Sequence, residues 1–261
     1  MTRQNFYKQR RRRSRRQVDE ELIVQLICQE RGVQPRLGGR KLLHMLGGEL
    51  AKAGVSIGRD RFFELLGEHE LLIERRVRSV HTTNSRHSFR VYANLLKDRL
   101  LTGPHQALVS DITYIRTAEG FLYLCLVMDA YSRAIVGFDC SDTLEREGAL
   151  RALGQALKQL PAGSETIHHS DRGSQYCCHE YVGMLEEAGV KISMTQENHC
   201  YENGKAERLN GILKQEYGLG SDFAGKSEAR QAVSEAVGLY NYRRPHEALG
   251  YAVPMEVHRA A

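Results

Sequence analysis

Long apolar runs are missing from this chain of 261 residues. No stretch approaches the roughly 18–20 apolar residues that a membrane-spanning helix needs, so we expect no membrane segment. The basic N-terminus is not followed by an apolar core, and we therefore expect no secretory signal. Six cysteines are present, but no two are spaced as a Cys-X-X-Cys pair. We interpret them as reduced, mostly structural thiols of a cytosolic protein, and adjacent Cys177 and Cys178 as packing residues.

The composition is otherwise ordinary, with 41% hydrophobic and 26% charged residues, and leaves room for one large or two modest domains. The charge is unevenly distributed. Residues 1–16 contain eight Lys or Arg and no acid, so the net charge of +5 becomes 29 basic against 32 acidic residues, or −3, for 17–261. Such a basic arm, assigned to 1–17, is typical of segments that bind nucleic acid phosphates. A disordered, solubilising tail is the alternative.

Apolar residues at helical spacing recur after the arm. They predict helices over 18–31 and 38–53, then a short turn and a third helix. Three short helices with a tight turn before the third are typical of a helix-turn-helix, and we assign 18–74 to such a domain. Arg59 and Arg61, near the start of the third helix, would then contact DNA. A plain three-helix bundle is the alternative.

The segment 75–104 has a different composition: it is basic, rich in Ser, Thr and Asn, and ends at Gly103-Pro104. We interpret it as a basic linker with a short helix around 91–100. Its arginines could follow a phosphate backbone, although an ordinary solvated connector would have the same composition.

The remaining residues, 105–261, alternate strand-like and helix-like patterns. Two short connections in a row join the first three apolar strands, which indicates an antiparallel meander. Helices and strands then alternate, which predicts an α/β fold with a mixed five-stranded sheet and flanking helices. The predicted strands are 107–117, 121–132, 134–140, 166–171 and 190–195, and the predicted helices are 144–160, 177–189 and 203–217.

Three acidic residues stand at informative places in this order. Asp111 lies within the first strand, Asp171 ends the fourth, and Glu207 lies on the polar side of the last of these helices, together with Asn203 and Lys214. A buried Asp is costly unless it is paired or binds a metal. Carboxylates brought together favour hard divalent cations, which take oxygen ligands and support phosphoryl transfer on nucleic acid.

The residues around these acids, DITY, HSDRGSQY and ENGKAER, resemble those of one family. The chain is similar over nearly its whole length to the second-reading-frame protein of insertion sequence 3 family transposases. NYRRPHEALGYAVP at 241–254 resembles that family's C-terminal signature. Retroviral integrases are more distant relatives with the same acidic triad. The resemblance implies a ribonuclease-H-like integrase core over 105–261, with a C-terminal helical tail.

The resemblance also implies an activity: metal-dependent 3′-end cleavage and strand transfer of an insertion element. Asp111, Asp171 and Glu207 would be both catalytic residues and ligands of two Mg²⁺ ions, with Mn²⁺ as an accepted substitute. The implied partners are DNA at the element ends and the target, the upstream-frame protein and further copies of the chain. The implied location is the bacterial cytoplasm, at the nucleoid. The DNA-binding residues expected on these grounds are Arg59, Arg61, Arg172, Asn203, Lys214, Arg243 and Arg244.

The chain departs from the family pattern at two places. It has no tryptophan, so Leu108 stands near the Trp that usually precedes the first catalytic Asp, and Glu202-Asn203 replaces a common Asp-Asn. Neither change removes a triad carboxylate. His168 and His169 precede Asp171 and could bind metal or move protons, but we favour a supporting role for them.

Two other classes of function stay open on the sequence. One is a non-catalytic helix-turn-helix regulator, which would not need the triad. The other is a ribonuclease-H-like nuclease or a retroviral-type integrase. The latter carries an N-terminal His-His-Cys-Cys zinc module, whereas Cys28 is the only cysteine here before residue 125.

Overall fold

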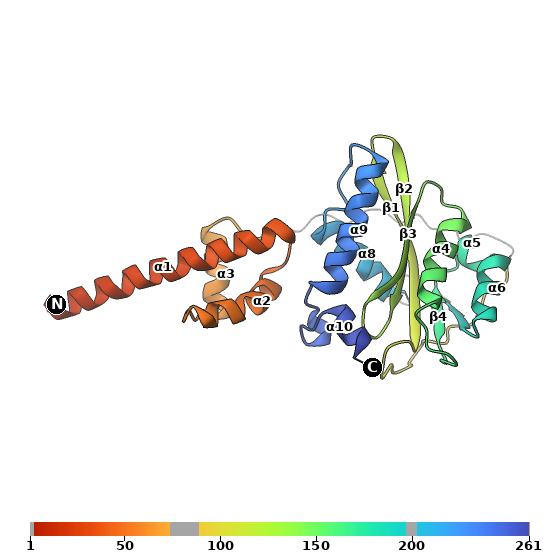
Figure 1. The fold of residues 1–261 in the computed structure, drawn as a ribbon, viewed down its shortest axis with the longest axis horizontal. Helices are drawn as coiled ribbons and strands as arrows, with labels where there is room; N and C mark the ends of the chain where they lie inside the picture. The colour runs from red at the N-terminus through yellow and green to blue at the C-terminus, as the bar shows by residue number, and fades with distance from the viewer. Residues whose placement is uncertain (1–2, 74–88, 197–202, 261) are drawn as a thin grey trace. The chain divides into compact units, whose positions relative to one another are not determined.

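The computed structural model describes residues 3–73, 89–196 and 203–260 (Figure 1). The chain divides into two compact units, Met1–Arg76 and Val77–Ala261. Each unit has a hydrophobic core of its own.

The first unit consists of helices α1 (Arg3–Val33), α2 (Gly39–Lys52) and α3 (Arg59–Glu68). The predicted helix 38–53 is confirmed to within a residue at each end. Each helix contributes an apolar stripe to one shared core, as the helical spacing of these residues predicts. The buried core residues of this unit are Ile23, Ile27, Leu37, Leu42, Leu46, Leu50, Val55, Phe62, Leu65 and Leu66.

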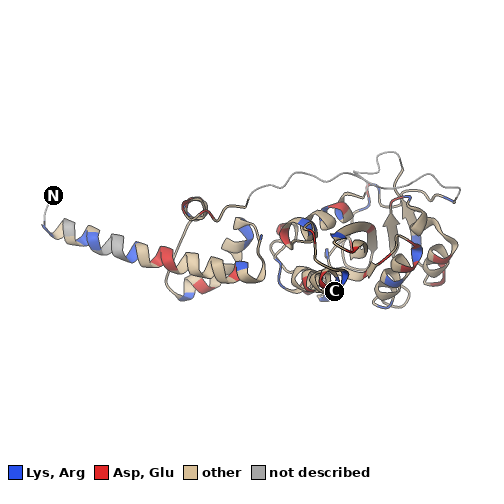
Figure 2. Cartoon of the chain, turned by 90° about the horizontal axis from the view of Figure 1, so that it is seen from above, with Lys and Arg blue, Asp and Glu red and all other residues tan. Residues whose placement is uncertain are grey.

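The first helix is much longer than predicted, because it begins at Arg3 rather than near residue 18. Among the described side chains of this helix, core packing begins at Leu22, so the earlier turns add nothing to it. Figure 2 shows Lys and Arg along this outer part of α1 and acidic residues after them. The segment contains no Pro or Gly before Gly32 and is rich in Arg and Gln, which are good helix formers. The basic arm is therefore a continuation of a core helix.

The second unit is built on one five-stranded sheet, as predicted, in the order β3-β2-β1-β4-β5. Strands β1, β2 and β3 form an antiparallel meander, and β4 and β5 run parallel to β1. The strands are β1 (Ala107–Thr117), β2 (Gly120–Asp129), β3 (Ile135–Ser141), β4 (Ile167–Ser170) and β5 (Lys191–Met194).

Helices cover both faces of this sheet (Figure 1). Helices α8 and α9 pack on one face, and α4, α5 and α6 pack on the other. Along β1, odd-numbered residues such as Val109 and Ile115 face α8 and α9, while Leu108 faces the opposite core. The helices are α4 (Arg146–Leu157), α5 (Ser174–Cys177), α6 (His179–Glu187), α8 (Gly204–Glu216), α9 (Lys226–Tyr242), the 3₁₀ helix η1 (Glu247–Leu249) and α10 (Pro254–Arg259).

The prediction of a short helix around 91–100 is wrong, because these residues form bends and turns. The side chain of Asn94 accepts hydrogen bonds from the backbone N–H groups of Leu96 and Lys97, which replaces helical bonding. The backbone N–H of Leu95 donates to Ser193 Oγ of β5 at 2.8 Å. Leu96 and Leu101 pack against the sheet, so this part of the expected linker is attached to the second unit.

No helix in the three described ranges has both the length and the apolar character to cross a membrane.

The close packing of α4 against the sheet can be tested by a substitution at Gly137. A Cβ at this position of β3 would stand 2.0 Å from the carbonyl oxygen of Ala152 in α4, a backbone atom that cannot turn aside. We expect Gly137→Ala to lower the free energy of unfolding by about 1–3 kcal/mol through overpacking. Gly183→Ala in α6 is the matched control, since nothing lies within 4 Å of its added methyl. Equal stability of the two variants in urea denaturation would contradict this packing.

Candidate active site

Asp111 lies in the middle of β1, paired with Leu126 of β2, and its odd register directs it to the face covered by α8. Its carboxylate accepts two hydrogen bonds among the described residues. The Nδ2 amide of Asn210 in α8 donates to Oδ2 at 2.7 Å, and the backbone N–H of Ile112 donates to Oδ1 at 2.9 Å. A carboxylate on the central strand is thereby held against α8.

Asp171 follows the last residue of β4, at the carboxyl end of that strand. The parallel register pairs Val109 with His169, and continuing it by two residues brings Asp171 beside Asp111. The backbone N–H of Gly173 donates to Asp171 Oδ1 at 2.9 Å and closes a tight turn. A Cβ on Gly173 would stand 3.0 Å from that same oxygen, so this position accommodates little beyond glycine.

Glu207 lies in the first turn of α8, where a negative charge is stabilised by the helix dipole. The same helix places Asn210 three residues further on, against Asp111. Asn203, the N-cap residue, is buried and donates from Nδ2 to the carbonyl oxygen of Ser110 at 3.1 Å. This bond fixes the start of α8 to β1 beside Asp111.

The three acids interact electrostatically. Burial, together with the neighbouring charges of Asp171 and Glu207, raises the pKa of Asp111 to about 7. The hydrogen bonds from Ile112 and Asn210 lower this pKa, but they offset only part of the increase. Without a cation, one of three neighbouring carboxyls therefore retains a proton near neutral pH.

The donor set around Asp111 fits a hard divalent cation, which takes oxygen ligands. Besides the acids, the side-chain oxygens of Asn203 and Asn210 are buried without a hydrogen-bond partner among the described residues. The triad is nevertheless not among the groups, within the described ranges, whose three ligand atoms all lie within 4.8 Å.

The two histidines before Asp171 are buried, and their contacts lie within the protein. Nε2 of His168 lies 2.7 Å from Ser110 Oγ and 2.9 Å from the hydroxyl of Tyr181. Burial lowers the pKa of His168 to about 3, so its ring is neutral. Nδ1 of His169 lies 2.8 Å from Ser193 Oγ of β5. These contacts join β1, β4, β5 and α6 beneath the acids.

Two of the residues expected to bind DNA are instead buried. Arg244 is only 2% exposed, makes a bidentate ion pair with Glu216 at 2.8 and 2.9 Å, and lies over the ring of Tyr240. Asn203 is 3% exposed and bonded to β1. The expectation that these side chains are available to a phosphate is therefore wrong, because each finds a partner from a different element. Arg243, next to Arg244, is exposed.

Other expected DNA contacts lie near the surface but are held by the protein. Arg61 forms ion pairs with Glu64 and Glu68 of its own helix and with Glu20 of α1, and the last of these ties α3 to α1. Arg59 is exposed and contacts Asp60. Such exposed pairs are weak and exchange readily for a phosphate, whereas the Arg61 network is a structural contact first.

Arg172 follows Asp171 in the chain, and Lys214 interacts electrostatically with Asp111. Arg172 donates to the carbonyl oxygens of Thr195 and Gln196, just after β5, at 2.7 and 2.6 Å. The Nζ of Lys214 lies 4.3 Å from the ring centre of Tyr114 on β1. Burial lowers the pKa of Lys214, while Tyr114 and Asp111 oppose that shift.

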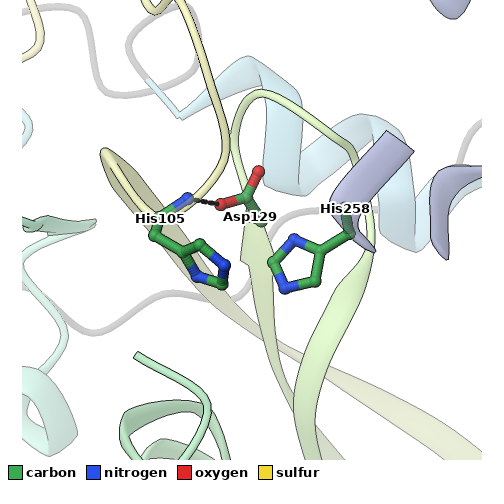
Figure 3. Close-up of side chains that lie close together, drawn as sticks. All are labelled: His105, Asp129 and His258. Carbon is green, nitrogen blue, oxygen red and sulfur yellow. Dashed lines mark hydrogen bonds between the residues drawn. The ribbon is translucent and has the colours of Figure 1, made fainter. Parts of the chain in front are cut away.

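The structure also brings together a cluster that sequence reasoning missed. His105, Asp129 and His258 each offer one potential ligand atom, and these atoms all lie within 4.8 Å of one another (Figure 3). The residues come from the segment before β1, the end of β2 and α10. No spacing motif links positions so far apart in the chain, so the sequence carried no signal for them.

Comparison with known proteins finds integrase core domains in the second unit, with matches over residues 102–200 and 188–254. The uncharacterized 31 kDa protein of insertion element IS600 from Shigella sonnei is 36% identical over 242 residues, covering 92% of this chain and 88% of that protein. The transposase for insertion sequence element IS629 from Shigella sonnei is 33% identical over 213 residues, covering 81% and 71%. Transposase InsF for insertion sequence IS3A from Escherichia coli strain K12 is 36% identical over 170 residues, covering 64% and 59%.

Among solved structures, the simian T-cell lymphotropic virus intasome in complex with PP2A regulatory subunit B56 gamma has a similar fold. The TM-score is 0.53 at 16% identity, with 86% of this chain and 71% of that chain covered. At this identity the likeness concerns the fold alone.

The raised pKa of Asp111 predicts a pH dependence of stability. Because its folded pKa of about 7 exceeds the unfolded value, the metal-free folded protein binds more protons than the unfolded chain between these values. Stability that is full at low pH is therefore lost as the pH rises through about 7. Asp111→Asn removes this loss. We expect the variant to melt about 2–6 °C above the wild type near pH 8, by a smaller margin near pH 5, and at the same temperature only below the unfolded pKa of 3.8.

The control for this comparison is Glu187→Gln, which neutralises an exposed carboxyl on α6. It should match the wild type at both pH values in thermal unfolding with chelator present. A constant offset between Asp111→Asn and the wild type across pH would show that the carboxyl of Asp111 is not under electrostatic strain.

Proposed function

The chain belongs to the insertion sequence 3 family of transposases, and we propose that Asp111, Asp171 and Glu207 are its catalytic carboxylates. It is a DNA transposase with a ribonuclease-H-like integrase core, as the sequence predicted. The observation that carries the catalytic assignment is electrostatic: three acids from β1, the end of β4 and α8 interact with one another, and the pKa of the buried member is raised to about 7. Such an arrangement is typical of a site completed by cations.

The same carboxylates would hold two Mg²⁺ ions, for which Mn²⁺ can substitute. When bound, the ions supply Lewis-acid stabilisation to the attacking and leaving oxygens of an in-line displacement at phosphorus. Asn210 holds Asp111 towards α8, and the turn at Gly173 holds Asp171 at the end of β4. The nucleophile is water during cleavage and the DNA 3′-hydroxyl during joining, so the protein needs no nucleophile of its own.

DNA would reach this site along exposed cations. Lys214, which interacts electrostatically with Asp111, and Arg172, next to Asp171 in the chain, would contact the phosphates next to the reacting bond. The basic turns of α1, Arg59 and Arg243 would contact phosphates further away, without reading sequence. Arg61 would join them only by releasing its acidic partners on α1 and α3.

Two partners belong to the proposal besides DNA. Joining two element ends requires two copies of a catalytic site, so the active form is at least a dimer on DNA. Recognition of the ends would come from the upstream-frame protein of the same element, fused or bound to this chain.

Asp171→Asn should retain DNA binding but abolish strand cleavage and joining in Mg²⁺. The substitution preserves side-chain size while removing one negative ligand, so the site loses metal affinity without losing its fold. The measurement uses labelled element-end DNA and follows nicking and strand transfer. It is made with the chain alone and with the chain fused to its upstream partner. Glu187→Gln is the control and should stay active. Wild-type activity of Asp171→Asn would contradict the proposal that Asp171 is catalytic.

Removing residues 1–16 should weaken DNA binding in a salt-dependent manner. For duplex DNA, the slope of log K against log salt falls by about 0.9 for each phosphate that the arm no longer neutralises. The melting temperature should be preserved, because the core packing of α1 begins at Leu22, beyond the deleted residues. Fluorescence anisotropy over a salt series measures the slope, and an unchanged slope would mean that the arm does not bind DNA.

A further inference from the structure

A second group of potential metal ligands lies in the same unit, away from the acids. Asp129 is the last residue of β2 and pairs with Leu108 of β1, three residues before Asp111. At about 3.3 Å per residue, this places it about 10 Å along the strand from the triad. His105 precedes β1, and His258 belongs to α10 near the end of the chain. The group therefore joins three segments that are distant in sequence.

The backbone of His105 is fixed at both ends in an unusual conformation. Its φ of 63° lies in the left-handed region, which non-glycine residues seldom adopt. Its N–H donates to Asp129 Oδ2 at 2.7 Å, and its carbonyl accepts from Thr166 Oγ1 at 2.6 Å. This conformation places its ring 4.5 Å from that of His258, at 60° (Figure 3). A strained backbone that brings two imidazoles together is typical of a functional position.

Asp129 and His258 are both buried and are held side by side by Ser132. The hydroxyl of Ser132 donates to Asp129 Oδ1 at 2.9 Å and lies 3.0 Å from His258 Nδ1. The backbone N–H groups of Tyr131 and Ser132 also donate to Oδ1, at 3.1 and 2.7 Å. Oδ2 accepts only the bond from His105 among the described residues. Outer hydrogen bonds that orient a carboxylate and an imidazole are what metal ligands require.

We propose that His105, Asp129 and His258 bind one zinc-like transition-metal ion that attaches α10 to the sheet. Two imidazole nitrogens and one carboxylate oxygen suit Zn²⁺, with water in a fourth position. Mg²⁺ would prefer oxygen ligands. Lys205 and Arg133 also interact electrostatically with Asp129, so the two imidazoles would supply most of the affinity. The site is thus chemically distinct from the carboxylates that serve catalysis.

The test is metal binding by the untagged full chain in the presence of excess Mg²⁺. Equilibrium dialysis counts bound Zn²⁺, and visible absorption of Co²⁺ reports tetrahedral coordination by nitrogen and oxygen. We expect one equivalent per chain and a rise in melting temperature with Zn²⁺. His258→Gln and His105→Asn should each lose that equivalent and the thermal shift. Asparagine is chosen because it tolerates the left-handed conformation of His105.

Two control variants separate this site from others. His179→Gln removes an exposed imidazole on α6, and Asp111→Asn removes a triad carboxylate. Both should keep the zinc equivalent. Circular dichroism of the metal-free His variants confirms that they fold, and either one suffices for the test. Absence of zinc binding by the wild type, or retention of the equivalent by a folded His258→Gln or His105→Asn, would overturn the proposal. Neither result bears on strand transfer.

Discussion

The rest of the second unit depends on one electrostatic constraint, the burial of the Asp111 carboxylate on the central strand. Burial and two neighbouring negative charges oppose its ionisation, and its two hydrogen bonds offset only part of that cost. Such a group is stable in its ionised form only when a cation shares the space. The surrounding contacts hold the strand and helix in place around that space: Asn203 fixes the start of α8 to β1, and His168 joins β1 to α6. Stability is given up at this site, as functional sites commonly require.

Local patterns predicted most of the second unit. Alternating apolar residues and short connections specified the meander, and the order of later elements specified a mixed sheet with helices on both faces. The register that brings Asp171 beside Asp111 is a long-range property, which the sequence alone does not encode in any short window. The helix expected at 91–100 failed for a local reason instead. Asn94 offered its backbone neighbours a competing hydrogen bond, and Leu95 found a partner in β5.

Basic residues were the least predictable part of the site. A run such as Arg243-Arg244 indicates an exposed charge, yet Arg244 is buried because Glu216, on another helix, matches its planar guanidinium with two hydrogen bonds. Arg61 likewise pairs with Glu20 across two helices. A sequence reveals the charge of a side chain but not which tertiary partner neutralises it. Only cations without such partners, or with weak exposed ones, remain suited to a phosphate.

The two sites offer different types of ligand, which explains how one sheet could carry both and bind a different cation at each. Carboxylates and amide oxygens surround Asp111, and such oxygen-rich sites suit hard cations. The cluster of His105, Asp129 and His258 offers two imidazoles beside one carboxylate, a ligand set that suits Zn²⁺. Zinc would therefore bind more tightly at His105 and His258 than at the carboxylates that we propose are catalytic. Selectivity would follow from the ligand chemistry of the two sites, one at the middle of β1 and one before its start, rather than from the abundance of either metal.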